Sequence, residues 1–309
     1  MLVRAAQRQY VDWISDSSRW VPYRPRCGDV VIATAPKCGT TWVQRIVALL
    51  IFKTTEPRSV DDESPCIEFS FYPLDMIYRT IEAQEHRRYL KAHLPLECLP
   101  LHSELHYIHV ARDGRDACVS LHDMVTGTNR GARQQSPEMA EAYDAVPENL
   151  RDFFRYWLTH GITQDQSDGA PFISFFDIET SFWARRKLDN LLMVHYNDLK
   201  ADLDGEMRRI AGFLGIEVDE AIWPALVKAA TFDEMRKSGA QIKPHAAHGM
   251  DKGSDGFFNK GTGGRWREHL TAEDEELYQA KVREKFSPAL AAWIEQGRLG
   301  AGDPHQSDD

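Results

Sequence analysis

The chain has 309 residues, 42% of which are hydrophobic, so it can bury a substantial core in one or two domains. It carries 37 Lys and Arg against 47 Asp and Glu, a formal net charge of -10. This acidity argues against a general nucleic-acid binder, because affinity for a phosphate backbone needs a basic face. A small anionic ligand held in a local basic pocket stays compatible with it.

The cysteine pattern and the absence of long apolar runs suggest a cytoplasmic protein. The five cysteines are Cys27, Cys38, Cys66, Cys98 and Cys118. They include no C-x-x-C pair, so neither a disulfide framework nor a structural zinc site is expected, and a reducing compartment fits better. The first residues lack the apolar stretch of a signal peptide. The most apolar segment, WVQRIVALLIF, is too short to span a bilayer, so no transmembrane segment is expected.

Strand and helix patterns alternate along the chain, which predicts an α/β protein with a central parallel sheet flanked by helices on both faces. The four strand candidates are DVVIATA (29–35), HRRYLKAH (86–93), LHYIHVA (105–111) and LLMVHY (191–196). The first is followed by TTWVQRIVALLIF (40–52), whose apolar residues recur at helical spacing, and the third by the helix candidate RDACVSLHDM (115–124). The last strand precedes a helix whose stripe, Met207 to Leu214, is closed by Gly215.

We interpret residues 1–299 as a single domain. The stretch at about 125–169 is polar and rich in turn-forming residues, with one amphipathic helix in ENLRDFFRYWL (148–158), and we interpret it as a lid or an insertion. The final segment, GAGDPHQSDD (300–309), is polar and is predicted to be a disordered tail.

The strongest local signal is the string APKCGTTW (35–42), between a predicted strand and a predicted helix. Gly39 lets the backbone approach an anion closely, and Thr40 and Thr41 stand at the helix start, where free N–H groups and the helix dipole attract phosphate. Lys37 adds a full charge. The spacing is not that of a Walker A loop, in which the Lys follows the last Gly. A strand-to-helix turn with ordinary caps is the alternative, and the complete string favours an anion-binding loop over it.

This string resembles the P-K-S-G-T-T-W loop of the cytosolic-type sulfotransferases that use 3'-phosphoadenosine 5'-phosphosulfate (PAPS). In that family the loop cradles the 5'-phosphosulfate. Cys38 stands where the family has a serine that is linked to control of the catalytic lysine. Cysteine is a poorer hydrogen-bond partner.

Two further segments resemble the family around its reacting groups. KAHLP (91–95) is similar to the family's K-T-H-L-P, which implies that His93 is the general base. By analogy with phosphoryl transfer, Lys37 and Lys91 are expected to stabilise charge on the transferred group and the leaving phosphate. A neutral histidine at a strand end can accept a proton from a hydroxyl, which agrees with that role. YIHVARDGRDACVS (107–120) is similar to the segment whose Arg and Ser bind the nucleotide 3'-phosphate, which implies Arg112 and Ser120. An Arg in a surface network with Asp113 and Asp116 is the alternative for Arg112.

Three more segments resemble the family's nucleotide contacts. HYNDL (195–199) implies that Tyr196 touches the adenine. Trp42 and Phe232, with Thr231 beside it in ATFDEM, match positions around the purine ring, although a core role is the commoner one for any single aromatic. FFNKGTGGRW (257–266) is similar to the late F-x-R-K-G-x-x-G-x-W segment. Lys260 and Gly261 match it, and Asn259 stands where an arginine is usual.

The resemblance implies the sulfotransferase fold, which is of the P-loop-containing nucleotide hydrolase type. It also implies transfer of a sulfuryl group from PAPS to a hydroxyl without a metal. AQEHRRYLKAHLPL and AAWIEQGRLG are closest to bacterial glycolipid sulfotransferases, which suggests a small hydrophobic or glycolipid acceptor. WREHLTAEDEE matches the family's dimerisation motif only in part and leaves a homodimer open.

Two alternatives remain. The first is a P-loop kinase or NTPase that uses Mg-ATP, but the Lys after the second Gly and the strand-end Asp that it needs are not in place. The second is a catalytically inactive nucleotide-binding scaffold of the same fold, against which the pairing of Lys37 with His93 argues. Since Lys37, His93, Arg112 and Tyr196 all follow predicted strands, one shared site at the carboxyl edge of the sheet is expected.

Overall fold

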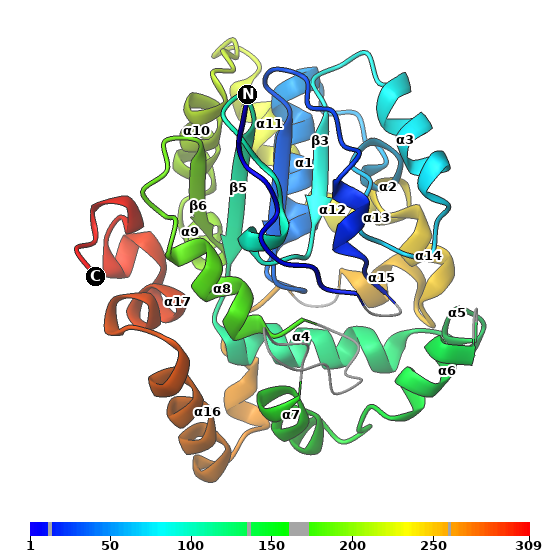
Figure 1. Cartoon of the computed structure of the whole chain (residues 1–309), viewed down its shortest axis with the longest axis vertical. Helices are drawn as coiled ribbons and strands as arrows, with labels where there is room; N and C mark the ends of the chain where they lie inside the picture. The colour runs from blue at the N-terminus through cyan, green and yellow to red at the C-terminus, as the bar shows by residue number, and fades with distance from the viewer. Residues whose placement is uncertain (12–13, 135–136, 161–172, 259–260) are drawn as a thin grey trace.

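Four parallel strands form the centre of the protein (Figure 1). The computed structural model describes residues 1–11, 14–134, 137–160, 173–258 and 261–309. In spatial order the strands are β3 (Tyr89–Ala92), β2 (Val30–Thr34), β5 (His106–Ala111) and β6 (Leu191–His195). All three strand pairs are parallel. In the middle of the sheet, Val31 of β2 is paired with Leu90 of β3 on one side and with Tyr107 of β5 on the other.

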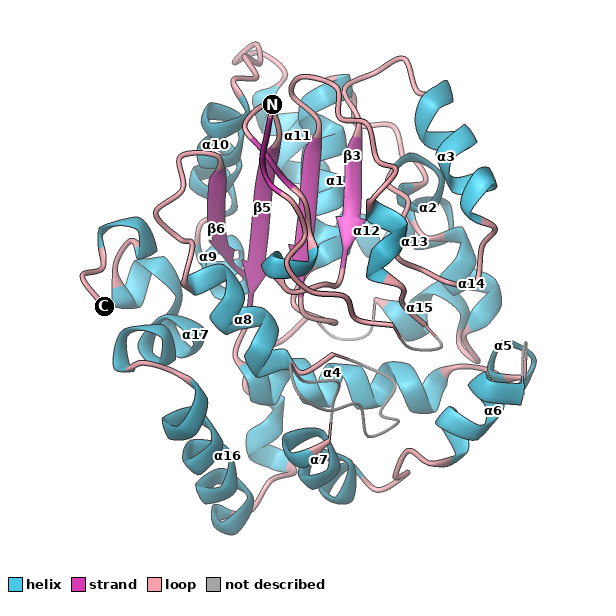
Figure 2. Cartoon of the chain, viewed as in Figure 1, coloured by secondary structure: helices cyan, strands magenta, loops and turns pink. Residues whose placement is uncertain are grey.

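Both faces of this sheet are buried, which explains why its strands are apolar runs rather than alternating ones. Val30 and Ile32 belong to one hydrophobic cluster, and their neighbours Val31 and Ala33 belong to a second cluster on the opposite face. Figure 2 shows the strands enclosed between helices.

The helices divide between the two clusters. The first cluster is covered mainly by α1 (Thr40–Phe52), α9 (Tyr196–Ala201), α10 (Leu203–Leu214), α11 (Trp223–Ala229), α12 (Phe232–Lys237) and α13 (Gly239–Ile242). The second is covered by α3 (Leu74–Ala83), α4 (Gly114–Gly127), α7 (Leu150–Thr159), α8 (Phe175–Trp183), α16 (Ala272–Lys285) and α17 (Pro288–Ala301).

Short elements complete the fold. They are α2 (Val60–Glu63), α5 (Arg130–Arg133), α6 (Pro137–Asp144), α14 (Pro244–Gly249), α15 (Gly253–Phe257), the antiparallel pair β1 (Leu2–Arg4) and β4 (Leu101–His102), and the 3-10 turns η1 (Ser17–Trp20), η2 (Leu96–Cys98), η3 (Arg265–Glu268) and η4 (Pro304–Gln306). In Figure 1, α4 runs across the space below the carboxyl ends of the strands, where α15 also lies.

The α/β architecture with a parallel central sheet is confirmed, and each predicted strand contains an observed one. The predicted stripe from Met207 to Leu214 is the buried face of α10, and Gly215 ends that helix in the left-handed conformation. The amphipathic helix predicted near residue 150 is α7, which packs against α4 and α16. Much of the rest of the predicted lid, residues 161–169, lies outside the described residues.

The final segment differs from the predicted disordered tail. Residues 304–306 form η4, the ring of Pro304 is buried, and the Ser307 carbonyl accepts a hydrogen bond from Arg186 Nη2 at 3.0 Å. The Asp309 carboxylate accepts a hydrogen bond from the Ser287 hydroxyl at the start of α17. Composition alone misses these contacts because they depend on groups distant in the sequence.

Candidate active site

A cavity of about 310 Å³ lies at the carboxyl ends of the parallel strands. Lys37 follows β2, His93 follows β3, Arg112 follows β5 and Tyr196 follows β6, and all four side chains line this cavity. The strand order β3-β2-β5-β6 places these residues along one edge of the sheet. The convergence predicted from the strand ends is therefore present.

The loop between β2 and α1 forms one wall of the cavity. Gly39, at a φ of 113°, is the residue before α1, and no side chain caps the first N–H groups of this helix. A Cβ at Gly39 would lie 3.1 Å from the Tyr196 ring, so a side chain would crowd the wall. Lys37 also has a left-handed φ, 68°, which is unusual for a residue with a Cβ. The uncapped helix start, lined by Thr40 and Thr41, is suited to bind an anion.

Arg112 connects three parts of the wall. Its Nη1 donates a hydrogen bond to the Lys37 carbonyl at 3.2 Å, and its Nη2 donates one to the Thr262 carbonyl at 3.3 Å. Its guanidinium lies 4.2 Å from the centre of the Tyr196 ring. Its Nε is buried and has no hydrogen-bond partner among the described residues. A guanidinium with an unused donor in a cavity is equipped to bind an anionic oxygen.

Aromatic rings line the cavity beside Arg112. Trp42 and Tyr196 meet edge to face at 5.3 Å, and the Trp42 indole N–H is already used by the Ala230 carbonyl at 2.8 Å. Phe232 lies so close to Gly261 that a Cβ on this glycine would come within 2.8 Å of the ring. Flat rings of this kind bury a purine or another planar group well.

A hydrogen bond to the backbone determines which ring nitrogen of His93 carries the proton. Its Nδ1 lies 2.9 Å from the Thr34 carbonyl, which can only accept, so Nδ1 carries the proton and Nε2 is left as an acceptor. Its backbone N–H donates to the buried Glu68 carboxylate at 2.6 Å, and its ring is stacked with Phe69 at 6.1 Å. Burial and the neighbouring Lys91 ammonium lower the pKa of His93 to about 3, so the ring is neutral near pH 7.

Lys37 and Lys91, the two lysines predicted to stabilise charge, both line the cavity. The Lys37 ammonium is 4.3 Å from the centre of the Phe257 ring, and the Lys91 ammonium is 4.7 Å from that of Phe69. Burial, followed by repulsion from Arg112, lowers the pKa of Lys37 to about 8. Placing cations together in this way is costly without an anion, which indicates that the cavity is built to receive one.

Comparison with known proteins identifies the family. A family model described as "Sulfotransferase domain" matches residues 28–288. The chain belongs to the sulfotransferase family, and it is a transferase. A curated relative named "Glycolipid sulfotransferase" from Mycobacterium bovis is 32% identical over an alignment of 316 residues, covering 94% of this chain and 95% of the relative. The human protein "Sulfotransferase 1C2" is 24% identical, covering 84% of this chain and 83% of the relative.

Solved structures show the same fold. Retinol dehydratase in complex with androsterone and inactive cofactor PAP has a TM-score of 0.67 at 21% identity, covering 87% of this sulfotransferase and 83% of that chain. Mouse sulfotransferase SULT7A1 complexed with PAP has a TM-score of 0.63 at 20% identity, covering 87% of each chain. The fold predicted from the resemblance is therefore confirmed.

Most of the predicted site residues lie together in this sulfotransferase. Those that line the cavity are Lys37, Gly39, Thr40, Thr41, Trp42, Lys91, His93, Arg112, Ser120, Tyr196, Phe232 and Gly261. Asn259 and Lys260 lie outside the described residues. Thr231 does not line the cavity: its hydroxyl donates to the Lys228 carbonyl at 2.8 Å and caps α12.

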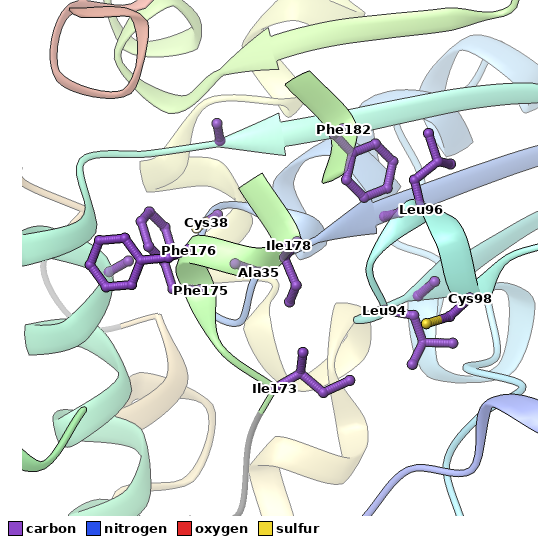
Figure 3. Packing of buried hydrophobic residues seen from close by; sticks show 14 of the residues in the cluster. Ala35, Cys38, Leu94, Leu96, Cys98, Ile173, Phe175, Phe176, Ile178 and Phe182 are labelled. Atoms are coloured by element: carbon purple, nitrogen blue, oxygen red, sulfur yellow. The ribbon is translucent and has the colours of Figure 1, made fainter. Parts of the chain in front are cut away.

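Cys38 does not line the cavity either. Its thiol is fully buried and is directed into the core beside α8, where Figure 3 shows it near Phe176 and Ile178. Burial raises the pKa of this thiol well above its usual range, so the neutral form is present near pH 7. The backbone of Cys38 can still contribute to the loop, but its side chain packs in the core.

We therefore expect Cys38→Ser to change stability more than nucleotide affinity. The Cys38 thiol donates to the Pro36 carbonyl at 3.9 Å. A hydroxyl, which sits closer to Cβ than the sulfur does, reaches this acceptor less well in surroundings that are otherwise apolar, which should cost about 1–2 kcal/mol of unfolding free energy. Denaturant unfolding measures this loss, and calorimetric titration with adenosine 3',5'-bisphosphate (PAP) should give a dissociation constant within about twofold of the unchanged protein. A tenfold change in PAP affinity would contradict this placement.

Sequence reasoning missed several residues that line the cavity, among them Lys243, Phe257, Thr262 and Arg265. Lys243 lies between α13 and α14, a stretch with no strand end and no motif to mark it. Phe257, Thr262 and Arg265 lie in the FFNKGTGGRW segment, which the motif marked, although none of the three was singled out there. Arg265 is paired with Asp123 at 2.6 Å.

Within the described ranges, no helix is long and apolar enough to cross a membrane. In the same parts of the chain no group of three or more His, Cys, Asp and Glu side chains is arranged to hold a metal ion.

Proposed function

We propose that this sulfotransferase moves a sulfuryl group from PAPS to a hydroxyl of an apolar acceptor, with a glycolipid as the favoured class. The observation that carries the proposal is the meeting of Lys37, His93 and Arg112 in one cavity. An anion-binding loop, a neutral imidazole and a guanidinium with an unused donor are the parts that such a transfer requires.

The cavity fits a doubly phosphorylated adenosine. Its described lining includes five cationic side chains, Lys37, Lys91, Arg112, Lys243 and Arg265, and no carboxylate. The phosphosulfate would occupy the start of α1, and the 3'-phosphate would lie near Arg112 and Ser120. Trp42 and Phe232 would hold the adenine. The same residues match the family's nucleotide contacts, which supports this orientation.

His93 would act as the general base. The acceptor oxygen attacks sulfur, the bond from sulfur to the bridging phosphate oxygen breaks, and the acceptor proton moves to Nε2 of His93. The products are a sulfate ester and PAP. The hydrogen bond from Nδ1 to the Thr34 carbonyl supports this role, because it leaves Nε2 free to accept the proton. Lys37 and Lys91 would stabilise charge on the transferred group and on the leaving phosphate.

The cavity also has an apolar lining against which an acceptor would pack. It includes Ile14, Phe69, Met124 and Ile173, and the Phe69 ring is stacked with the His93 imidazole. The exposed Phe71 follows Phe69, and the two rings lie 5.6 Å apart, so aromatic surface continues from the imidazole to the outside. The 32% identity to a mycobacterial protein named glycolipid sulfotransferase supports a hydroxyl borne on an amphiphile.

The test is a transfer assay with purified protein, PAPS and a panel of phenols, sterols and glycolipids, read by mass spectrometry. We expect a product heavier by one sulfuryl group and an equal amount of PAP. A parallel panel with Mg-ATP should give no phosphorylated product. PAP binding without transfer to any acceptor would instead support an inactive scaffold, and ATP-dependent transfer would support a kinase.

Nucleotide affinity should depend on pH through Lys37. Its pKa is about 8 in the free protein, so the ammonium that attracts phosphate is present below pH 8 and is lost above it. Bound phosphate would raise this pKa, so binding takes up a proton and PAP affinity should fall by up to about tenfold per pH unit from pH 8 upward. Calorimetry at pH 7 to 9.5 measures this slope. Lys37→Arg should flatten it, since the guanidinium stays charged, and a flat profile in the unchanged protein would refute the argument.

A further inference from the structure

Lys243 lines the cavity, and no role has been assigned to it so far. It lies between α13 and α14, outside every family motif. Lys91 and His93 line the same cavity. The nearest charges to the Lys243 ammonium are those of Lys91 and Asp61. The ammonium also lies 5.9 Å from the centre of the Phe257 ring, which it shares with Lys37, so Lys243 neighbours both predicted catalytic lysines.

The side chain of Lys243 is held in place by a carboxylate that lies outside the cavity lining. The Asp61 carboxylate accepts a hydrogen bond from the Lys243 ammonium and another, at 3.0 Å, from the backbone N–H of His245. The side chains of Lys243 and Asp61 are only 12% and 6% exposed. Lys243 lines the cavity and Asp61 does not, so the carboxylate fixes the ammonium from the protein side. An ammonium has three donors, and those not used by Asp61 remain for a ligand.

No carboxylate lines the cavity beside the two lysines in the described part of the chain. Lys91 makes no ion pair within the described residues, and its ammonium lies 4.7 Å from the centre of the Phe69 ring. Asp61 pairs with Lys243 from outside the lining, and the buried Glu68 carboxylate behind His93 is engaged by the His93 backbone N–H at 2.6 Å. Burial, followed by repulsion from Lys91, lowers the pKa of Lys243 to about 8. An anion that entered the cavity here would relieve that repulsion.

We propose that Lys243 and Lys91 form an anion subsite beside His93, and that the preferred acceptors are hydroxyl compounds with an oxyacid group, such as a carboxylate, next to an apolar body. This inference rests on the proposed function, since it concerns the acceptor of the same transfer. The Phe69 ring packs against the Lys91 ammonium and Ile14 lines the same cavity, so the body that carries the hydroxyl would pack on apolar surface while the acid reaches the ammonium groups. Lys243 then determines specificity, because it distinguishes an acidic acceptor from a neutral one of the same shape.

The experiment measures acceptor binding to the PAP-loaded protein with two matched probes, 2-naphthol and 6-hydroxy-2-naphthoate. They share the ring and the hydroxyl and differ in one carboxylate. We expect the naphthoate to bind at least about tenfold more tightly, as a charge-assisted contact in a desolvated site predicts. In Lys243→Gln this ratio should fall to near one, whereas Lys243→Arg should keep most of it. Lys200→Gln, at an exposed lysine of α9, is the matched control and should leave the ratio unchanged.

Asp61→Asn should change the affinity ratio of the two probes in the opposite direction to Lys243→Gln. Removing the carboxylate that competes for the Lys243 ammonium should strengthen naphthoate binding severalfold relative to naphthol, which a purely structural ion pair does not predict. Equal affinities for the two probes in the unchanged protein, including no binding of either, would overturn the anion subsite even if a variant failed to fold. Failure of PAP itself to bind would instead overturn the proposed function, so the two failures are distinguishable.

Discussion

His93→Ala should lower the rate of sulfuryl transfer by about 10²–10⁴-fold while leaving the dissociation constant of PAP within about twofold. The reason is that Nε2 is the acceptor left after Nδ1 donates to the Thr34 carbonyl, so the variant loses the group that we propose removes the acceptor proton. Single-turnover transfer with saturating PAPS separates this loss from any change in binding.

Two controls separate a chemical role of His93 from a structural one. His269→Ala removes an exposed histidine far along the chain and should leave the rate unchanged. Added imidazole should restore part of the rate in His93→Ala, because a free base can enter the space that the ring vacates. An equal loss of PAP affinity and transfer, with no rescue by imidazole, would contradict the assignment of His93 as the base.

Arg112→Ala should weaken PAP binding by about 1.5–3 kcal/mol, which is roughly 10- to 150-fold, and should affect adenosine 5'-phosphosulfate much less. The 3'-phosphate is the group that the second nucleotide lacks, and the buried Nε of Arg112 has no other partner in the described part of the chain. Paired calorimetric titrations with the two nucleotides measure the difference.

Arg112 also supports the wall of the cavity, so a second variant is needed. Its hydrogen bonds to the carbonyls of Lys37 and Thr262 would be lost in the alanine variant. Arg112→Lys keeps a charge without the planar fork and should give an intermediate loss of PAP affinity. If both nucleotides lost affinity equally in Arg112→Ala, Arg112 would stabilise the loop after β2 and would not bind the 3'-phosphate.

Residues at regular positions of the fold could be predicted from the sequence. His93 and Arg112 each follow an apolar strand, and parallel strands bring such residues to one edge whatever the rest of the chain does. Lys243 could not be predicted in this way. It lies between two short helices whose position depends on Asp61, a residue nearly two hundred positions earlier in the chain.

Cys38 shows a different limit. The loop that the motif marked lines the cavity through Lys37 and Gly39, but Lys37 adopts a left-handed φ, and the Cys38 side chain is directed into the core. The direction of a side chain in a loop depends on backbone dihedral angles that residue identity leaves open. The final ten residues show the same limit, since their composition suits disorder although Pro304 and Ser307 find partners.

Thr34, the last residue of β2, contacts both the proposed base and the proposed anion-binding helix. Its carbonyl accepts from His93, and its hydroxyl lies 2.6 Å from that of Thr40, the first residue of α1. Both are thus anchored to one residue of the central sheet. A substitution in a wall of the cavity can therefore alter the space for an acceptor without shifting His93 relative to the start of α1.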